Sequence, residues 1–150
     1  MSATLEQSGM DLGDIERRAE RFAAEGPAGE RLDFSIDSLA AIDAWLDTAR
    51  ARRGARAADW VAGAGCYVGE VIRRHVGGRW RDRAAPATRR GGWWRLGGRD
   101  DFNPVLDLDR LIITPVDKVR ARLGDAGEDT IERYYDAVER MVIPRIEDLA

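Results

Sequence analysis

The arginines and tryptophans between residues 73 and 99 are the side chains of this sequence best suited to bind a charged partner. The segment contains nine arginines and one acid, a formal charge of +8, whereas the remaining 15 basic and 26 acidic residues give −11. Three of the five tryptophans lie in the same segment. Guanidinium groups bind phosphates and carboxylates, and aromatic rings between them stack on bases or anchor protein interfaces. The pattern predicts a contact surface made of Arg79, Trp80, Arg81, Trp93 and Arg95.

Three interpretations of this basic segment are open from the sequence. The arginines could hold a polyanion such as a nucleic acid, or they could meet an acidic protein surface. Alternatively, the tryptophans bury against helices while the arginines coat the solvent side, where charge discourages edge-to-edge pairing of strands. The acidic remainder of the chain argues against non-specific DNA binding, which needs positive charge across a domain. We therefore expect a protein or anionic partner and do not expect recognition of a specific nucleic acid.

Tyr67, Glu70 and Arg74 form the second candidate site, because they share one predicted helix at helical spacing. Glu70 points away from the apolar stripe of that helix, so it either forms an exposed ion pair with Arg74 or lies buried on a second face. A buried Glu70 would need Arg73 or Arg74 as a partner. In that case these residues, with Tyr134, could line the pocket of a small enzyme or ligand-binding protein, and the pKa of Glu70 would be raised.

The remaining reactive side chains lack the neighbours that catalysis requires. His75 is the only histidine, on an apolar stripe with no nucleophile placed beside it, and Cys66 is the only cysteine. Asp107 and Asp109 could share a strand face, but they lack the further oxygen ligands that a hard cation needs, which favours turn and edge roles. We therefore predict no cofactor, no metal and no catalytic residue, and a non-enzymatic binding or regulatory module.

Helical periodicity accounts for most of the chain. Apolar residues at spacings of three and four predict helices over residues 11–25, 36–53 and 57–76. Ser35 is suited to cap the second helix. Its buried stripe is predicted to comprise Ile36, Leu39, Ile42, Leu46 and Ala49. Start signals at residues 114–117 and 129–132 predict two further helices, the last of which ends before Pro144.

Three glycines interrupt the third predicted helix, at positions 63, 65 and 69. Each costs about 0.5–1 kcal/mol relative to alanine in a helix interior, so their presence needs a reason. The missing Cβ atoms let another backbone approach closely. This approach could come from the same chain or from a second copy, so we expect close packing and leave a homo-oligomer open.

After Gly77 and Gly78 the periodicity changes from 3.6 to 2, which indicates strands. Residues 78–83 and 92–96 alternate and predict an antiparallel pair, and residues 104–108 and 110–113 add one or two more strands. The order of elements predicts an α+β fold, a short antiparallel sheet of about two to four strands with about five helices packed around it. We expect residues 11–150 to form a single domain and residues 1–10, which carry no pattern, to be disordered.

Composition predicts where the protein works. No apolar run reaches 18 residues, and no apolar stretch follows a basic start, so neither a membrane span nor a secretory signal is indicated. With one cysteine, a reducing cytoplasm is the expected compartment. Of the 24 basic residues, 23 are arginine, which suggests a GC-rich bacterial coding sequence.

Three motifs carry a resemblance to other proteins. They are a Ser-Leu and Ile-Asp pair within residues 38–43, a Tyr-x-Gly-Glu-Val-Ile-Arg run at residues 67–73, and Gly-Gly-Arg-Trp at residues 77–80. In these motifs, residues 33–80 resemble a group of small bacterial proteins of unknown function, and Tyr134-Tyr135 is a weaker match. The resemblance implies a shared fold and no particular chemistry.

Overall fold

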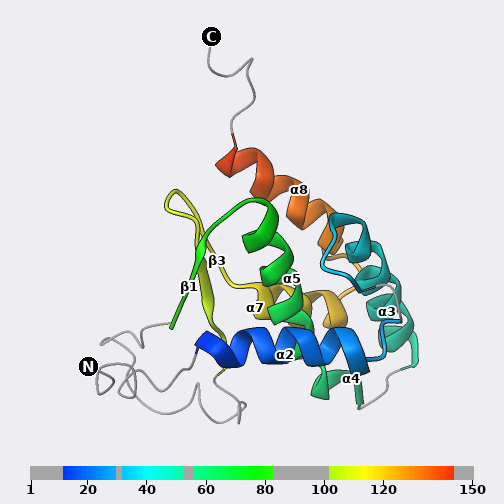
Figure 1. Ribbon diagram of the computed structural model, residues 1–150. Coiled ribbons are helices and arrows are strands. Elements are labelled where there is room, and N and C mark those ends of the chain that lie inside the picture. The colour runs from blue at the N-terminus through cyan, green and yellow to red at the C-terminus, as the bar shows by residue number, and fades with distance from the viewer. Residues whose placement is uncertain (1–11, 30–31, 53–55, 83–101, 144–150) are drawn as a thin grey trace, which may run out of the picture.

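Helices pack on one face of a small sheet in the computed structural model, which describes residues 12–29, 32–52, 56–82 and 102–143 (Figure 1). The helices are α2 (Leu12–Glu25), α3 (Leu39–Arg52), α4 (Arg56–Asp59), α5 (Val61–His75), α7 (Pro115–Gly124) and α8 (Ile131–Val142), with a 3-10 turn η1 (Ile36–Ser38) before α3. The strands are β1 (Arg79–Arg81), β2 (Val105–Asp107) and β3 (Ile112–Ile113). The predicted α+β class is confirmed. Within the described ranges, no helix combines the length and apolar character needed to cross a membrane.

Helix α5 is the centre of the fold, and every residue from Ala64 to Ile72 is buried. Its small residues are where other elements approach. A Cβ at Gly65 would lie 2.5 Å from the Cα of Val116 in α7, and a Cβ at Gly69 would overlap the indole of Trp80 in β1. The predicted close packing is therefore confirmed, and elements of the same chain occupy the space beside both glycines.

The helix predicted over residues 57–76 is divided in two. Trp60 lies between the two helices with φ −103° and ψ −1°, a turn conformation that ends α4 at Asp59 before α5 begins at Val61. The ring of Trp60 packs at 6.0 Å from that of Phe22 in α2. The short α4 thus precedes α5 as a separate turn of helix.

Ser35 caps the second helical segment as predicted, accepting a hydrogen bond from the backbone N–H of Ser38 at 3.2 Å. Leu39, Ile42 and Leu46 of the predicted stripe are fully buried, but Ile36 is 39% exposed, so its assignment to the stripe is wrong. The segment begins as a 3-10 turn, which advances about 120° per residue instead of 100°. That change of phase rotates Ile36 off the buried side.

The sheet has the order β1-β2-β3 with both pairings antiparallel. Trp80 lies opposite Leu106, which lies opposite Ile113, and these three side chains form the inner face toward α5. The alternation predicted for residues 78–83 is confirmed in β1, where two exposed arginines flank a buried tryptophan. Both strands predicted after residue 103 are confirmed as β2 and β3. The predicted strand over residues 92–96 and the prediction for residues 1–10 lie outside the described residues.

A buried ion pair fastens α3, α7 and α8 together on the other side of the core. The Asp43 carboxylate in α3 accepts hydrogen bonds from the backbone N–H groups of Ile131 at 2.8 Å and Glu132 at 3.2 Å, at the start of α8. Arg122 of α7 is 4% exposed and lies 3.4 Å from Asp43 and 2.9 Å from Asp47. Because the N–H groups at a helix start lack intrahelical partners, Asp43 supplies a second cap beside Thr130.

Candidate functional site

Trp80 faces the helices and not the solvent. Its side chain occupies the space left by Gly69, is 6% exposed, and donates a hydrogen bond from Nε1 to Glu70 Oε2 at 2.8 Å. The sequence-based contact surface grouped Trp80 with Arg79 and Arg81, and this grouping is wrong because successive side chains of a strand point to opposite faces. Trp80 instead anchors β1 to α5.

The carboxylate of Glu70 is the buried end of this anchor, with no exposed surface. Arg73 donates to both of its oxygens, from Nε at 2.7 Å and from a terminal nitrogen at 3.0 Å, and Arg74 Nε donates at 3.3 Å. Burial by itself would raise the pKa of Glu70, but the hydrogen bonds from Arg73 and Trp80 and the charges of both arginines outweigh it and hold the pKa below its ordinary value. Glu70 is therefore not an exposed ion pair but lies buried with Arg73, Arg74 and Trp80 as partners, and the raised pKa expected for a pocket residue is wrong.

Tyr67 belongs to a neighbouring hydrogen-bond cluster around Phe34. Its hydroxyl accepts from the backbone N–H of Phe34 at 2.8 Å and shares a hydrogen bond with Ser38 Oγ at 2.6 Å. Burial raises the pKa of Tyr67 above its ordinary value, so the phenol stays neutral. The ring of Phe34 lies 4.5 Å from that of Tyr67 and 4.0 Å from the guanidinium of Arg74, and this stacking joins Tyr67 to the Glu70 cluster.

Phe34 is the residue of this cluster that sequence analysis missed. Its φ of +63° lies in the left-handed region, which costs about 1–3 kcal/mol for a side chain of this kind. Three contacts hold it there: the Tyr67 hydroxyl, the Arg74 guanidinium, and His75 Nε2 at 3.0 Å from the Phe34 carbonyl oxygen. His75 is exposed, so its expected place on an apolar stripe is wrong.

The three sequence motifs behind the resemblance meet at this place. Ser38 contacts Tyr67, and Trp80 contacts Glu70, three residues further along the same helix. Tyr134, which the pocket hypothesis added, contacts a different part of the chain, with Lys118 Nζ 5.4 Å from its ring. The motifs therefore specify how the loop at residues 32–38 and strand β1 fasten to α5.

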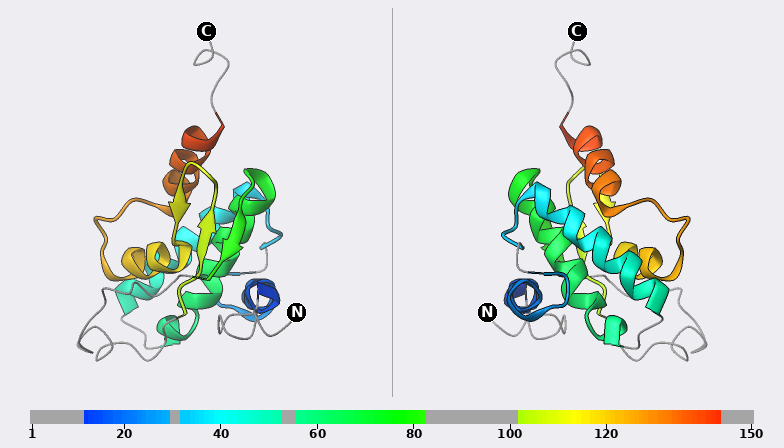
Figure 2. Two further views of the ribbon diagram at one scale, coloured as in Figure 1. Left: turned by 90° about the vertical axis from the view of Figure 1, so that its left-hand side faces the viewer. Right: turned by 90° about the vertical axis from the view of Figure 1, so that its right-hand side faces the viewer.

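The contact between Trp80 and Glu70 fixes the inner side of β1 to α5 and leaves the opposite side of the sheet facing away from the helices. This opposite side carries Arg79 and Arg81 on β1, Val105 and Asp107 on β2, and Ile112 on β3, and we call these five residues the outer face. In the left view of Figure 2 the strands lie toward the viewer with α5 behind them. Among the described elements, no helix covers this face.

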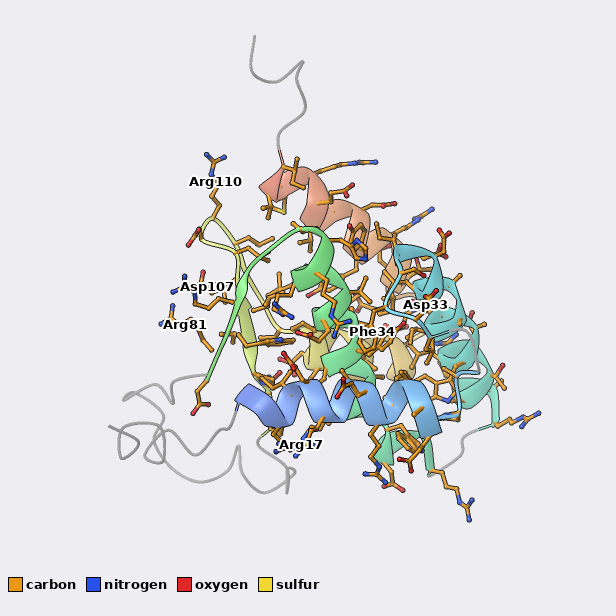
Figure 3. The ribbon with its side chains drawn as sticks, in the orientation of Figure 1. Arg17, Asp33, Phe34, Arg81, Asp107 and Arg110 are labelled. Carbon is orange, nitrogen blue, oxygen red and sulfur yellow. The ribbon has the colours of Figure 1, made fainter. Side chains whose placement is uncertain are left out.

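Charge and apolar area alternate across the outer face. Arg81 donates to Asp107 Oδ2 at 2.6 Å, and both side chains point away from the helices (Figure 3). The hydrogen bond from Arg81, the one from the backbone of Asp109 and the charge of Arg79 lower the pKa of Asp107. Ile112, opposite Asp107 in the register, is 59% exposed. Arg81 thus pairs with Asp107, close to the charge of Arg79 and beside an exposed aliphatic side chain.

The remaining candidates have structural roles. Asp107 accepts a hydrogen bond from the backbone N–H of Asp109 at 2.9 Å, and Asp109 adopts φ +70°. These two residues therefore form a turn, which is the role that their sequence favoured over metal binding. Among the described residues, no group of three or more histidine, cysteine or acidic side chains is placed to hold a metal ion. Cys66 is buried, which raises the pKa of its thiol to about 12 and keeps it protonated. Trp93 and Arg95 lie outside the described residues.

No match to this chain was found among protein families, curated proteins or solved structures. The resemblance of residues 33–80 to the bacterial group stays a prediction. A function for the chain therefore has to be inferred from its own geometry.

Proposed function

We propose that this protein is a non-enzymatic binding module that contacts a partner protein through the outer face of its sheet. The observation that carries the proposal is the geometry of β1. Arg79 and Arg81 are exposed, while Trp80 between them is fixed to a fully buried Glu70. A contact surface on a strand that is held in place loses little conformational entropy on binding.

The composition of the outer face favours a protein over a nucleic acid. Proteins that bind single strands provide aromatic rings for base stacking, and Trp80 is turned inward. Asp107 lies at the centre of the face, where it would repel phosphate groups. Arginine and exposed aliphatic side chains are instead typical of the cores of protein interfaces.

The geometry does not favour the alternative of a small enzyme or ligand pocket around Tyr67, Glu70 and Arg74. Both oxygens of Glu70 already accept hydrogen bonds, four in all, and its pKa is shifted opposite to the direction that a general acid needs. The neutral Tyr67 hydroxyl is engaged with Phe34 and Ser38. These residues support the binding strand.

A cytoplasmic, bacterial setting belongs to the same proposal. It is supported by the arginine-rich composition and by the single cysteine, which is buried and protonated. A partner in that setting would be a protein of the same cytoplasm.

A pull-down from a lysate of the native host tests the proposal. The baits are the wild type, the double variant Arg79→Glu/Arg81→Glu, and the control Arg133→Glu/Arg140→Glu, which makes the same change of charge on the exposed side of α8. We expect partners recovered by the wild type and the control to be lost with the β1 variant. Equal recovery by all three baits would contradict the proposal.

A further inference from the structure

We propose that the partner supplies an extended acidic segment, with carboxylates at alternate positions over β1 and aliphatic side chains over Ile112. This inference rests on the proposed function and names the chemistry of the partner that the outer face takes.

The spacing of the two arginines indicates an extended segment. Arg79 and Arg81 are two residues apart on one strand face, which places their Cα atoms roughly 6.6 Å apart. Acidic residues at positions i and i+2 of an extended partner repeat at the same distance. Two carboxylates of such a segment can therefore meet the two guanidinium groups in register.

Asp107 shows within the molecule how this face binds a carboxylate. Its oxygen lies 2.6 Å from Arg81, and the charge of Arg79 also lowers its pKa. Arg81 is paired with Asp107, and the charge of Arg79, also exposed on β1, is left for a partner. Arginine binds carboxylates through paired hydrogen bonds, which makes it specific for this geometry. Asp107 thus competes with the partner for Arg81.

Ile112 distinguishes a protein segment from a simple polyanion. It is 59% exposed and lies opposite Asp107, next to the charged part of the face. A protein segment with aliphatic side chains would remove this apolar surface from water, whereas polyphosphate or a nucleic acid backbone gains nothing from it. The arginines and Ile112 together therefore fit an acidic segment that also carries apolar residues.

The test uses a defined probe, a fluorescein-labelled peptide of sequence Glu-Ser-Glu-Ser-Val-Ser-Val, whose glutamates and valines project from the same side of an extended chain. The same peptide with lysine in place of glutamate, and polyphosphate, are the comparison ligands. Fluorescence anisotropy is measured with the full chain. We expect the glutamate peptide to bind the wild type, Arg79→Glu/Arg81→Glu to weaken it at least tenfold, and Ile112→Ser to weaken it about threefold. Asp107→Asn should tighten binding several-fold, because it releases Arg81. The control Arg133→Glu/Arg140→Glu should bind like the wild type.

Three results would overturn the inference. They are the absence of binding by the glutamate peptide, weaker binding by Asp107→Asn, or polyphosphate binding as tightly as the peptide with no dependence on Ile112. If the peptide does not bind while the lysate partners still depend on Arg79 and Arg81, the proposed function stands and only the partner chemistry is wrong. Circular dichroism spectra that match the wild type establish that each variant is folded.

Discussion

Replacing Glu70 by glutamine tests whether the buried carboxylate holds β1 against α5. The change keeps the shape of the side chain but removes the charge that accepts hydrogen bonds from Arg73, Arg74 and Trp80. Breaking a fully buried ion pair costs about 3–5 kcal/mol. Here the side chains of Arg73 and Arg74 are 34% and 38% exposed and can regain water, so the cost is reduced to about 2–3 kcal/mol.

Urea unfolding followed by circular dichroism measures this loss. For a domain of this size, a change of about 2–3 kcal/mol lowers the urea midpoint by about 1 M. Glu16→Gln is the matched control, since Glu16 is 56% exposed and lies 4.0 Å from the same Arg73, and we expect its effect to stay within about 0.5 kcal/mol. A Glu70→Gln midpoint equal to that of the control would refute the view that this carboxylate anchors the strand.

Three further predictions follow from the same geometry. The pKa of Glu70 in the folded protein lies below its ordinary value of 4.5, so the stability that its charge contributes is present above pH 4.5 and is lost as the pH falls through the folded pKa. Glu70→Gln should therefore flatten the decline of the unfolding free energy below about pH 4.5. Gly69→Ala should displace the facing indole and cost about 2 kcal/mol or more in urea unfolding, whereas Gly124→Ala, with open space around it, should cost less than about 0.5 kcal/mol. Asp43→Asn should cost about 3 kcal/mol because it weakens the cap at the start of α8 and leaves the buried Arg122 with only the half-exposed Asp47 as a charge partner; Asp47→Asn should cost about 1 kcal/mol or less in the same assay.

Local patterns predicted those parts of the fold that depend on local physics. The cap at Ser35, the apolar stripe of α2 and the alternation in β1 follow from interactions within a few residues. The prediction that Ile36 is buried was wrong because its segment begins with a 3-10 turn. The spacing of apolar residues in the sequence does not show this change from 100° to about 120° per residue.

The candidate site depended on long-range contacts that the sequence shows only in part. Helical spacing placed Glu70 away from the apolar stripe, but its burial depends on Trp80, which reaches it from a strand after the helix ends. Phe34 was missed because its contacts come from residues 33 and 41 positions away. Asp43 contacts a helix start 88 residues further along, and its one signal was a carboxylate next to Ile42 on the buried stripe.

The most direct test of binding through the outer face is how much partner protein each bait retains. Recovery from the native lysate is quantified by mass spectrometry for the wild type, Arg79→Glu/Arg81→Glu and the α8 control. We expect the proteins enriched by the wild type to fall to background with the β1 variant and to persist with the control. Undiminished recovery by the β1 variant would contradict binding through the outer face.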